Sequence, residues 1–331
     1  MVLMTMRQDF RAPAFGAASA REIYSAAFDM FRFADTNGFD FLVLSEHHGV
    51  DDGWMPAPLT IAAAALASTQ RAPLMLSAAI VPLHDPVRIA EQIAVIDNAF
   101  PGRLMTVFGA GYKVDEFEMA GVDHETRGKV LEEYVDVILR AWTTDAFEWR
   151  GRTIRVTPKP ATKPHPMVLV GGGVPAAARR AARLRLPMLP MNTDPRVAEA
   201  YHDEAKKIGF DSGFVMVPEG PTFVHVADDP DKAWAEIGEY LLYETSTYAS
   251  YQTHGQTSTP MVRGASSVDD LRKAPQLWVG TPDEIYEKAS ALAPMAALNF
   301  HPLAGGLPPA LAWPSLELFA SSVLPRLRGV V

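Results

Sequence analysis

Residues 41–50 read FLVLSEHHGV, and this stretch sets the expectation for the whole fold. Residues 41–44 are all apolar, which is the length and composition of a strand buried on both faces. The run stops at Ser45 and is followed at once by three titratable side chains, Glu46, His47 and His48. A core strand that ends in this way indicates a fold in which strand ends carry chemistry.

Outside this stretch, short apolar runs rich in β-branched residues alternate with amphipathic segments. Predicted strands cover 1–6, 41–45, 74–83, 103–111, 167–173, 186–191, 221–227 and 295–303, and a predicted helix follows each, at 20–37, 58–68, 86–99, 126–142, 175–185, 195–208, 230–243 and 308–327. The helix at 86–99 has a candidate N-cap in Asp85 and a proline at its first position, Pro86. Eight strand-plus-helix units predict an α/β fold, the (β/α)8 TIM barrel.

Composition narrows the possible functions. The chain has 331 residues, of which 48% are hydrophobic and 21% charged, and a formal net charge of −9 with both signs interspersed. Because a basic surface is missing, we expect no nucleic-acid partner. No run approaches the roughly 18 apolar residues of a membrane-spanning helix, so we expect no membrane partner. With no cysteine there is no disulfide, thiol nucleophile or thiolate metal site, and we expect a cytoplasmic protein.

The organisation of the chain predicts one domain. No linker divides residues 1–331, so we expect a single TIM-barrel domain. The longest polar interruption, 244–270, follows the seventh strand and helix. A stretch of this length inside a compact fold is usually functional, and we expect a mobile lid near the barrel mouth. A merely solvated excursion is the alternative.

The barrel gives the residues of 41–50 a role. In such folds the active site lies at the carboxyl ends of the strands, where Glu46, His47 and His48 are expected. Successive strand residues point to opposite sides, so one histidine should face the pocket and the other a neighbouring loop. A metal pair would more naturally be His-x-His, and we therefore expect no metal.

Two glycine clusters also end predicted strands. Gly171, Gly172 and Gly173 stand between a strand and a helix that begins at Pro175, which would present free backbone N–H groups and a positive helix end to an anion, such as a phosphate. In FGAGY, residues 108–112, the glycines would let the backbone approach a flat ligand. The arginine-rich stretch 179–185 is interpreted as a solvated helix face.

Several motifs occur together and in order: SEHHG at 45–49, SAAIVPLHDPVRIAEQIAVIDNAFPGRL at 77–104, GAGYKVDEFEMAGVDHETRGKVLEEYVDVI at 109–138 and GGGVPAAARRAARLRLPM at 171–188. Through them the chain resembles bacterial luciferase and the luciferase-like flavin-dependent monooxygenases. The resemblance is close over about 38–195 and looser toward the C-terminus.

The resemblance implies a TIM barrel that uses reduced flavin mononucleotide (FMN) and O₂ to oxygenate a small organic substrate. His47 matches the family's active-site histidine, which could act as a general acid or base. Glu46 either orients it or pairs with a basic neighbour. Ala78 and Ala79 match a non-proline cis peptide under the flavin ring, and we expect that bond here. Gly109 and Gly111 belong to the same cofactor wall.

The departures from bacterial luciferase concern the flavin phosphate. The family's phosphate-binding arginine and serine are replaced by Ala110 and Val174, whereas Arg127 matches a second arginine. The phosphate would then rest on Arg127, on the amides of Gly172, Gly173 and Val174 and on the helix end. We therefore expect weak flavin binding and a purified protein that often lacks it.

The substrate and partners follow less directly. Candidate substrate-wall residues are Met6, Phe10, Tyr112, Met191 and His301. No nicotinamide fingerprint follows a predicted strand, so a separate flavin reductase should supply the reduced FMN. The family's habit of pairing implies a homodimer. Two other functions stay open: an oxidoreductase of the same superfamily that uses the deazaflavin F420, and a degenerate barrel without catalysis.

Overall fold

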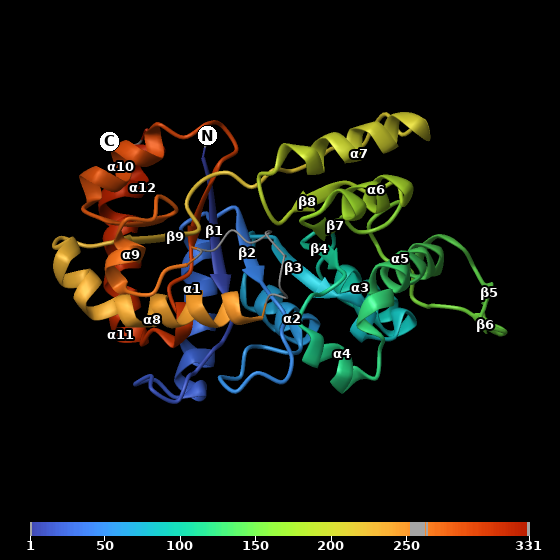
Figure 1. Cartoon of the computed structure of the whole chain (residues 1–331), viewed down its shortest axis with the longest axis horizontal. Helices are drawn as coiled ribbons and strands as arrows, with labels where there is room; N and C mark the ends of the chain where they lie inside the picture. Colours follow the sequence, from blue (N-terminus) through green and yellow to red (C-terminus); the bar gives the residue numbers. More distant parts are fainter. Residues whose placement is uncertain (1, 252–261, 263, 330–331) are drawn as a thin grey trace.

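In this computed structural model, which describes residues 2–251, 262 and 264–329, the centre of the fold is a curled parallel sheet (Figure 1). Its strands run in the order β11-β1-β2-β3-β4-β7-β8, and every neighbouring pair is parallel. The strands are β1 (Leu3–Gln8), β2 (Phe41–Leu44), β3 (Leu74–Ile80), β4 (Leu104–Gly109), β7 (Val168–Gly172), β8 (Met188–Pro190) and β11 (Ala297–Phe300).

Two smaller sheets accompany it. Strand β9 (Phe223–Val226) pairs in parallel with β10 (Leu277–Gly280), and β9 also contacts β11. Strands β5 (Phe147–Trp149) and β6 (Arg152–Ile154) form an antiparallel hairpin away from the sheet (Figure 1). Each of the eight predicted strand ranges overlaps an observed strand, whereas β5, β6 and β10 were not predicted.

Helices cover the outer face of the sheet (Figure 1). The α-helices are α1 (Ala20–Thr36), α2 (Pro58–Ser68), α3 (Pro86–Ala99), α4 (Val114–Ala120), α5 (Arg127–Thr143), α6 (Pro175–Arg183), α7 (Pro195–Lys207), α8 (Pro230–Ser250), α9 (Val268–Arg272), α10 (Pro282–Ser290), α11 (Pro309–Leu318) and α12 (Leu324–Leu327). Short 3₁₀ turns are η1 (Val81–Leu83), η2 (His124–Thr126) and η3 (Ala304–Gly306), and η4 (Phe319–Val323) is a π-helical turn. Asp85 caps α3 as predicted, accepting hydrogen bonds from the amides of Val87 and Arg88.

The main ladder does not close into a ring of eight strands in the part of the chain that the structure describes. Instead, the irregular segment 214–221 connects its two edges. Met188 in β8 exchanges backbone hydrogen bonds with Phe214 and Met216, and the amide of Ala297 in β11 donates to Glu219 over 2.9 Å. A curled parallel sheet with an irregular segment across its gap therefore encloses the interior.

The expected lid at 244–270 is partly helix. Residues 244–250 are the last two turns of α8, and Glu244 there is buried. Residues 252–261 and 263 lie outside the described part, so the lid itself stays a prediction. No described helix has both the length and the apolar composition needed to cross a bilayer.

Candidate active site

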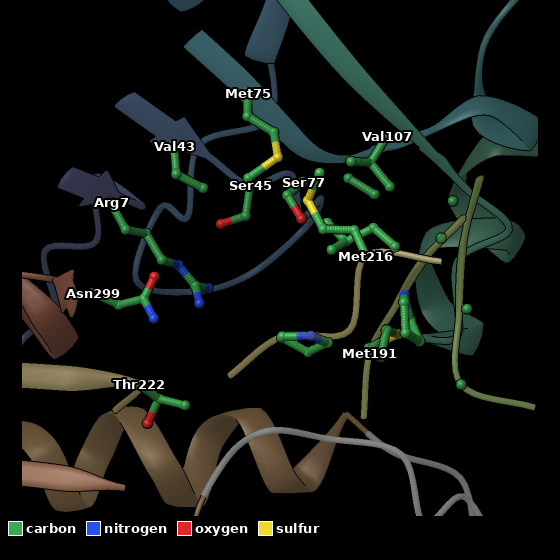
Figure 2. Close-up of a pocket in the computed structure, with 18 of the residues that line it drawn as sticks. Arg7, Val43, Ser45, Met75, Ser77, Val107, Met191, Met216, Thr222 and Asn299 are labelled. Carbon is green, nitrogen blue, oxygen red and sulfur yellow. The ribbon is translucent and has the colours of Figure 1, made fainter. Parts of the chain in front are cut away.

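A cavity of about 980 Å³ occupies the concave side of the sheet (Figure 2). Alternate strand residues line it, such as Leu3, Thr5 and Arg7 of β1, because side chains on a strand point to opposite faces. The segment 214–221 supplies much of the remaining wall. His47 lines one part of the cavity and the triple glycine Gly171–Gly173 another, so the two predicted features share one space.

His47 is held by a carboxylate that the sequence analysis missed. Its Nδ1 lies 2.7 Å from Oε1 of Glu116 in the first turn of α4, and the same oxygen accepts the amide of His48 over 2.9 Å. An ionised carboxylate only accepts hydrogen bonds, so a neutral His47 carries its proton on Nδ1. Nε2 is then an acceptor, and it lies 3.1 Å from the hydroxyl of Tyr112.

Aromatic side chains exclude water from this imidazole. Its ring centroid lies 4.5 Å from that of Trp54 and 5.3 Å from that of Tyr251. Burial, and then the neighbouring Tyr248, raises the pKa of Tyr112 well above its usual range. Tyr112 therefore stays protonated and can donate its O–H to Nε2 of His47.

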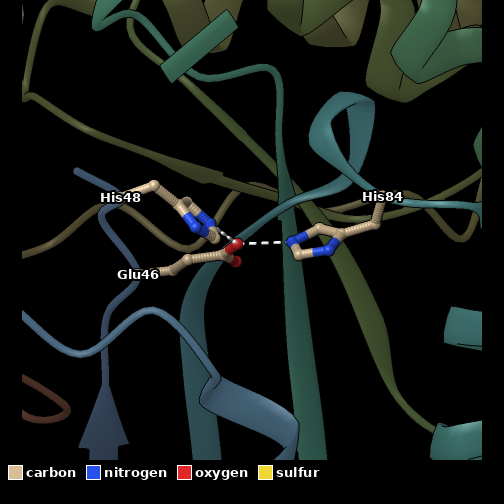
Figure 3. A group of neighbouring side chains, drawn as sticks. All are labelled: Glu46, His48 and His84. Carbon is tan, nitrogen blue, oxygen red and sulfur yellow. Dashed lines mark hydrogen bonds and ion pairs between the residues drawn. The ribbon is translucent and has the colours of Figure 1, made fainter. Parts of the chain in front are cut away.

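Of the two roles considered for Glu46 from the sequence, the structure shows pairing with basic neighbours and not orientation of His47. Oε1 of Glu46 accepts from Nε2 of His48, over 2.6 Å, and from Nε2 of His84, while its Oε2 accepts the amide of Ile80 over 2.9 Å (Figure 3). Burial opposes ionisation, yet the hydrogen bonds from His48 and His84 lower the pKa of Glu46 to about 2. Glu46 thus ties the end of β2 to η1, and its neighbour His48 faces this loop while His47 faces the cavity, as predicted.

A second polar group lies where β1 and β11 end. The guanidinium of Arg11 is fully buried and binds Asp52 over 2.6 Å and Glu244. Oδ2 of Asp9 lies 3.1 Å from Nε2 of His301. Burial opposes ionisation of Asp9, but His301 and Arg11 lower its pKa to about 2. This group fixes the chain around the cavity rather than presenting charges freely.

The glycine end of the cavity has the features of an anion site. Gly172 has φ of 152°, and a Cβ there would lie 2.5 Å from Cβ of Ala177, so only glycine fits. Helix α6 has no side-chain cap, and among the described residues the amides of Gly173 and Val174 donate no hydrogen bond. Open amides at a helix start favour an anion. Arg127 also lines this end, as expected.

Arg180 lines the same end, which corrects the interpretation of 179–185 as a wholly solvated face. Burial, with Arg183 and Arg127 opposing Glu132, lowers the pKa of Arg180. Arg127 and Arg180 line the same cavity, and their like charges favour an anion at this end of it. The carboxylate of Glu125 also lines this end but is largely exposed.

The wall between the two ends is formed by β3 and β4. Ala78, Gly109, Ala110 and Gly111 line the cavity, but Ala79 does not. The register between β3 and β4 shifts between Ser77 and Ala79, so Ala79 turns into the helix-covered core. The non-proline cis peptide bond is Ser77-Ala78, one residue earlier than expected.

Of the predicted substrate-wall residues, three line the cavity and two do not. Tyr112, Met191 and His301 line it. Met6 has the opposite strand parity from Arg7 and is buried under the helices. Phe10 packs against Tyr24 of α1, with ring centroids 4.6 Å apart. The sequence identified both as apolar but not which face they occupy.

Two clusters bring together three potential metal ligands each among the described residues: Glu46, His48 and His84, and Asp9, Glu244 and His301. In the first cluster, hydrogen bonds from His48 and His84 to Glu46 explain why the three side chains lie close together (Figure 3). In the second, Arg11 and His301 neutralise the carboxylates. Neither cluster requires a metal to account for its geometry.

The curled parallel sheet, the His47–Glu116 pair and the open amides of the glycine end together define an α/β protein with a candidate active site on the concave side of its sheet. The chain belongs to the luciferase-like monooxygenase family, whose model matches residues 9–297. It is 25% identical over 285 residues to the FMNH₂-dependent dimethylsulfone monooxygenase of Pseudomonas putida, covering 79% of this chain and 77% of that protein. It is 26% identical over 325 residues to limonene 1,2-monooxygenase of Rhodococcus erythropolis, covering 91% and 81%.

Solved structures share the fold. Monooxygenase RslO1 of Streptomyces bottropensis superposes with a TM-score of 0.76 at 24% identity, over 98% of this chain and all of that one. An F420-dependent secondary alcohol dehydrogenase superposes with a TM-score of 0.67 at 16% identity, over 97% and 98%. At these identities the likeness concerns the fold alone.

Proposed function

We propose that this enzyme is a two-component monooxygenase that uses reduced FMN and O₂ to oxygenate a small organic substrate. The observation that carries the proposal is one continuous cavity, lined at one part by His47 and at another by the open amides and arginines of the glycine end. Family membership and relatives named as monooxygenases support it, one of them as FMNH₂-dependent.

The residues present fit FMN. The amides of Gly173 and Val174, the start of α6, Arg127 and Arg180 would hold its phosphate. Ala78 and Gly109 would lie along the flat ring, since a Cβ at Gly109 would already lie 3.0 Å from Cβ of Ala78 and narrow that space. When bound, reduced FMN would supply the electrons that activate O₂.

His47 would be the general acid or base that transfers a proton during the reaction. Its Nδ1 is held by Glu116, so Nε2 is the atom that faces the cavity and can take or give a proton at the reacting centre. Tyr112 orients Nε2 and would shift to the substrate as it enters. The aromatic side chains around His47 keep water away, which protects a reactive oxygen species from wasteful release.

The proposal also covers the source of reduced FMN, the domain organisation and the oligomeric state. A separate flavin reductase would supply the reduced FMN, and the Pseudomonas putida relative is named as FMNH₂-dependent. The fold would act as a single-domain barrel in which 214–221 takes the place of a strand. A cytoplasmic homodimer completes the proposal, by resemblance to the family.

F420 remains the alternative cofactor, supported only by a shared fold at 16% identity. A degenerate barrel is less consistent with the site, because a non-catalytic ligand pocket has no need for a His–Glu pair aimed into it. The test is an anaerobic titration with reduced FMN and, separately, reduced F420, followed by ¹⁸O₂. Tight binding of reduced F420 alone, or no ¹⁸O in any candidate product and no O₂ uptake, would overturn the proposal.

A further inference from the structure

Arg7 is a cationic side chain inside the cavity that has no partner among the residues that the structure describes. It is the third inward residue of β1, after Leu3 and Thr5, and its side chain extends into the cavity (Figure 2). Its Nε is buried with no hydrogen-bond partner, and no ion pair among the described residues includes it. The other interior arginine, Arg11, is by contrast bound to Asp52 and Glu244.

The neighbours of Arg7 do not neutralise it by contact. Val43 stands beside it in the β1–β2 register. The side-chain N–H of Asn299 donates to the carbonyl of Pro221 over 2.7 Å, and its side-chain oxygen accepts from the hydroxyl of Thr5 over 2.6 Å. The charge of Arg7 helps to lower the pKa of Asp9, but the side chain of Asp9 contacts His301 and the backbone amide of Arg11 rather than Arg7. Burying part of a guanidinium without a hydrogen-bond partner costs free energy, and a bound anion would offset that cost.

The position of Arg7 separates it from the proposed phosphate site. Residues of that site follow β4 and β7, whereas Arg7 is on β1, and β2 and β3 lie between them in the sheet. The hydroxyls of Ser45, after β2, and Ser77, in β3, also point into the cavity, and Met75 and Met216 add apolar wall (Figure 2). The surroundings suit an apolar molecule with one charged end.

We propose that Arg7 binds the oxyanion of an otherwise apolar organic substrate, a carboxylate or a sulfonate. The planar guanidinium can donate two parallel hydrogen bonds to such a group, and Ser45 and Ser77 can add one each. The apolar part of the substrate then lies along Val43 and Met75. The placement of this molecule beside His47 rests on the proposed function, but its binding to Arg7 does not.

The experiment measures binding of three probes with an eight-carbon chain to the flavin-free protein: 1-octanesulfonate, octanoate and 1-octanol, by isothermal titration calorimetry at constant ionic strength. We expect wild type to bind both anions at least about tenfold tighter than the alcohol. Arg7→Gln should lower the affinity for the anions about ten- to a hundredfold and leave that for octanol within about threefold. Arg7→Lys, which keeps the charge without the fork, should fall between them.

Arg127→Gln is the matched control, since it removes a guanidinium from the other end of the cavity. It should weaken FMN binding and spare the anion preference, whereas Arg7→Gln should do the reverse. The inference is wrong if wild type binds neither anion or has no preference for them, if Arg127→Gln abolishes the preference, or if Arg7→Gln affects only reduced FMN. Thermal melting of Arg7→Lys and Arg7→Gln separates lost binding from lost folding. Because no flavin is present, failure here is distinct from failure of the monooxygenase reaction.

Discussion

Nδ1 of His47, at the end of β2, lies 2.7 Å from Oε1 of Glu116, which is 69 residues later and in the first turn of α4. The contact joins the loop after β2 to helix α4 at the carboxyl edge of the sheet and fixes which imidazole nitrogen faces the cavity. We therefore expect different effects from replacing His47, which would transfer the proton, and Glu116, which positions the imidazole.

Replacing His47 should remove the proton-transfer group while sparing the cofactor site. We expect His47→Gln to lower kcat about 10²- to 10⁴-fold, because a positioned acid or base contributes that much. FMN affinity, read by quenching of flavin fluorescence, should change less than about twofold, since the phosphate site lies elsewhere in the cavity. A variant with wild-type turnover would exclude His47 as the catalytic group.

Glu116 is a positioning residue, so its charge and its geometry can be separated. Glu116→Gln keeps an oxygen for Nδ1–H and should lower kcat about tenfold, whereas Glu116→Ala should approach the loss seen for His47→Gln. The pH dependence of kcat should also shift toward lower pH in Glu116→Gln, because a neutral amide stabilises imidazolium less than a carboxylate does. An unchanged pH profile would indicate a merely structural role.

The Glu46 cluster should stabilise the fold in a limited pH window. The pKa of Glu46 is lowered from 4.5 to about 2, so its contribution is present above about pH 4.5 and is lost as the pH falls toward 2. Burial opposes protonation of His84, but Glu46 raises its pKa above 6.5, so that contribution is complete below pH 6.5 and is lost at higher pH.

The difference in unfolding free energy between wild type and Glu46→Gln should thus be greatest between about pH 4.5 and 6.5, on the order of 2–3 kcal/mol. Urea unfolding from pH 3 to 8 measures it. A pH-independent difference would mean that Glu46 acts through packing alone.

Arg180 should contribute to phosphate binding in place of the arginine that Ala110 replaces. Arg180→Gln should weaken FMN binding about tenfold or more and leave riboflavin binding unchanged, because riboflavin lacks the phosphate. Arg183→Gln is the matched control, since Arg183 is on the same helix but binds Glu132 and Glu204 outside the cavity. Equal effects of both variants would indicate a general electrostatic contribution rather than contact.

Gly128 offers a test with opposite signs for stability and binding. A Cβ at Gly128 would lie 2.3 Å from Nη2 of Arg180, so Gly128→Ala must displace the end of that flexible side chain. Alanine is favoured over glycine in a helix by about 0.5–1 kcal/mol, so the melting temperature should stay level or rise. FMN affinity should nevertheless fall as it does in Arg180→Gln. Unchanged FMN affinity would place Arg180 outside the phosphate site.

The sequence predicted much of the fold because strand and helix periodicities are local. It located every strand of the curled sheet, and it placed His47 and the triple glycine at strand ends that prove to share a cavity. Strand β10 was missed because four residues after a long polar stretch carry little periodic signal. The closed barrel was an extrapolation from the count of units, and 214–221 has no strand pattern to reveal its position.

Side-chain direction was the harder part. Glu116 has no local signal, since its partner is far away in the chain and only packing brings α4 to β2. Met6 and Arg7 are adjacent on β1, and the prediction from residue type assigned the apolar Met6 to the substrate wall. Strand alternation from Thr5 would instead have placed Arg7 in the cavity. Arg180 follows Ala177 by three residues on α6, and this helical spacing places it on the face of the glycine turn.

The irregular segment 214–221 has an evolutionary consequence. It borders the substrate space, yet it contributes few rungs to the ladder that holds the molecule together. Insertions, deletions and exchanges of Val215, Met216 or Val217 can therefore reshape what the enzyme accepts while the framework that carries His47 stays intact. Chimeras that exchange only this stretch between relatives should change substrate preference while the sheet stays folded.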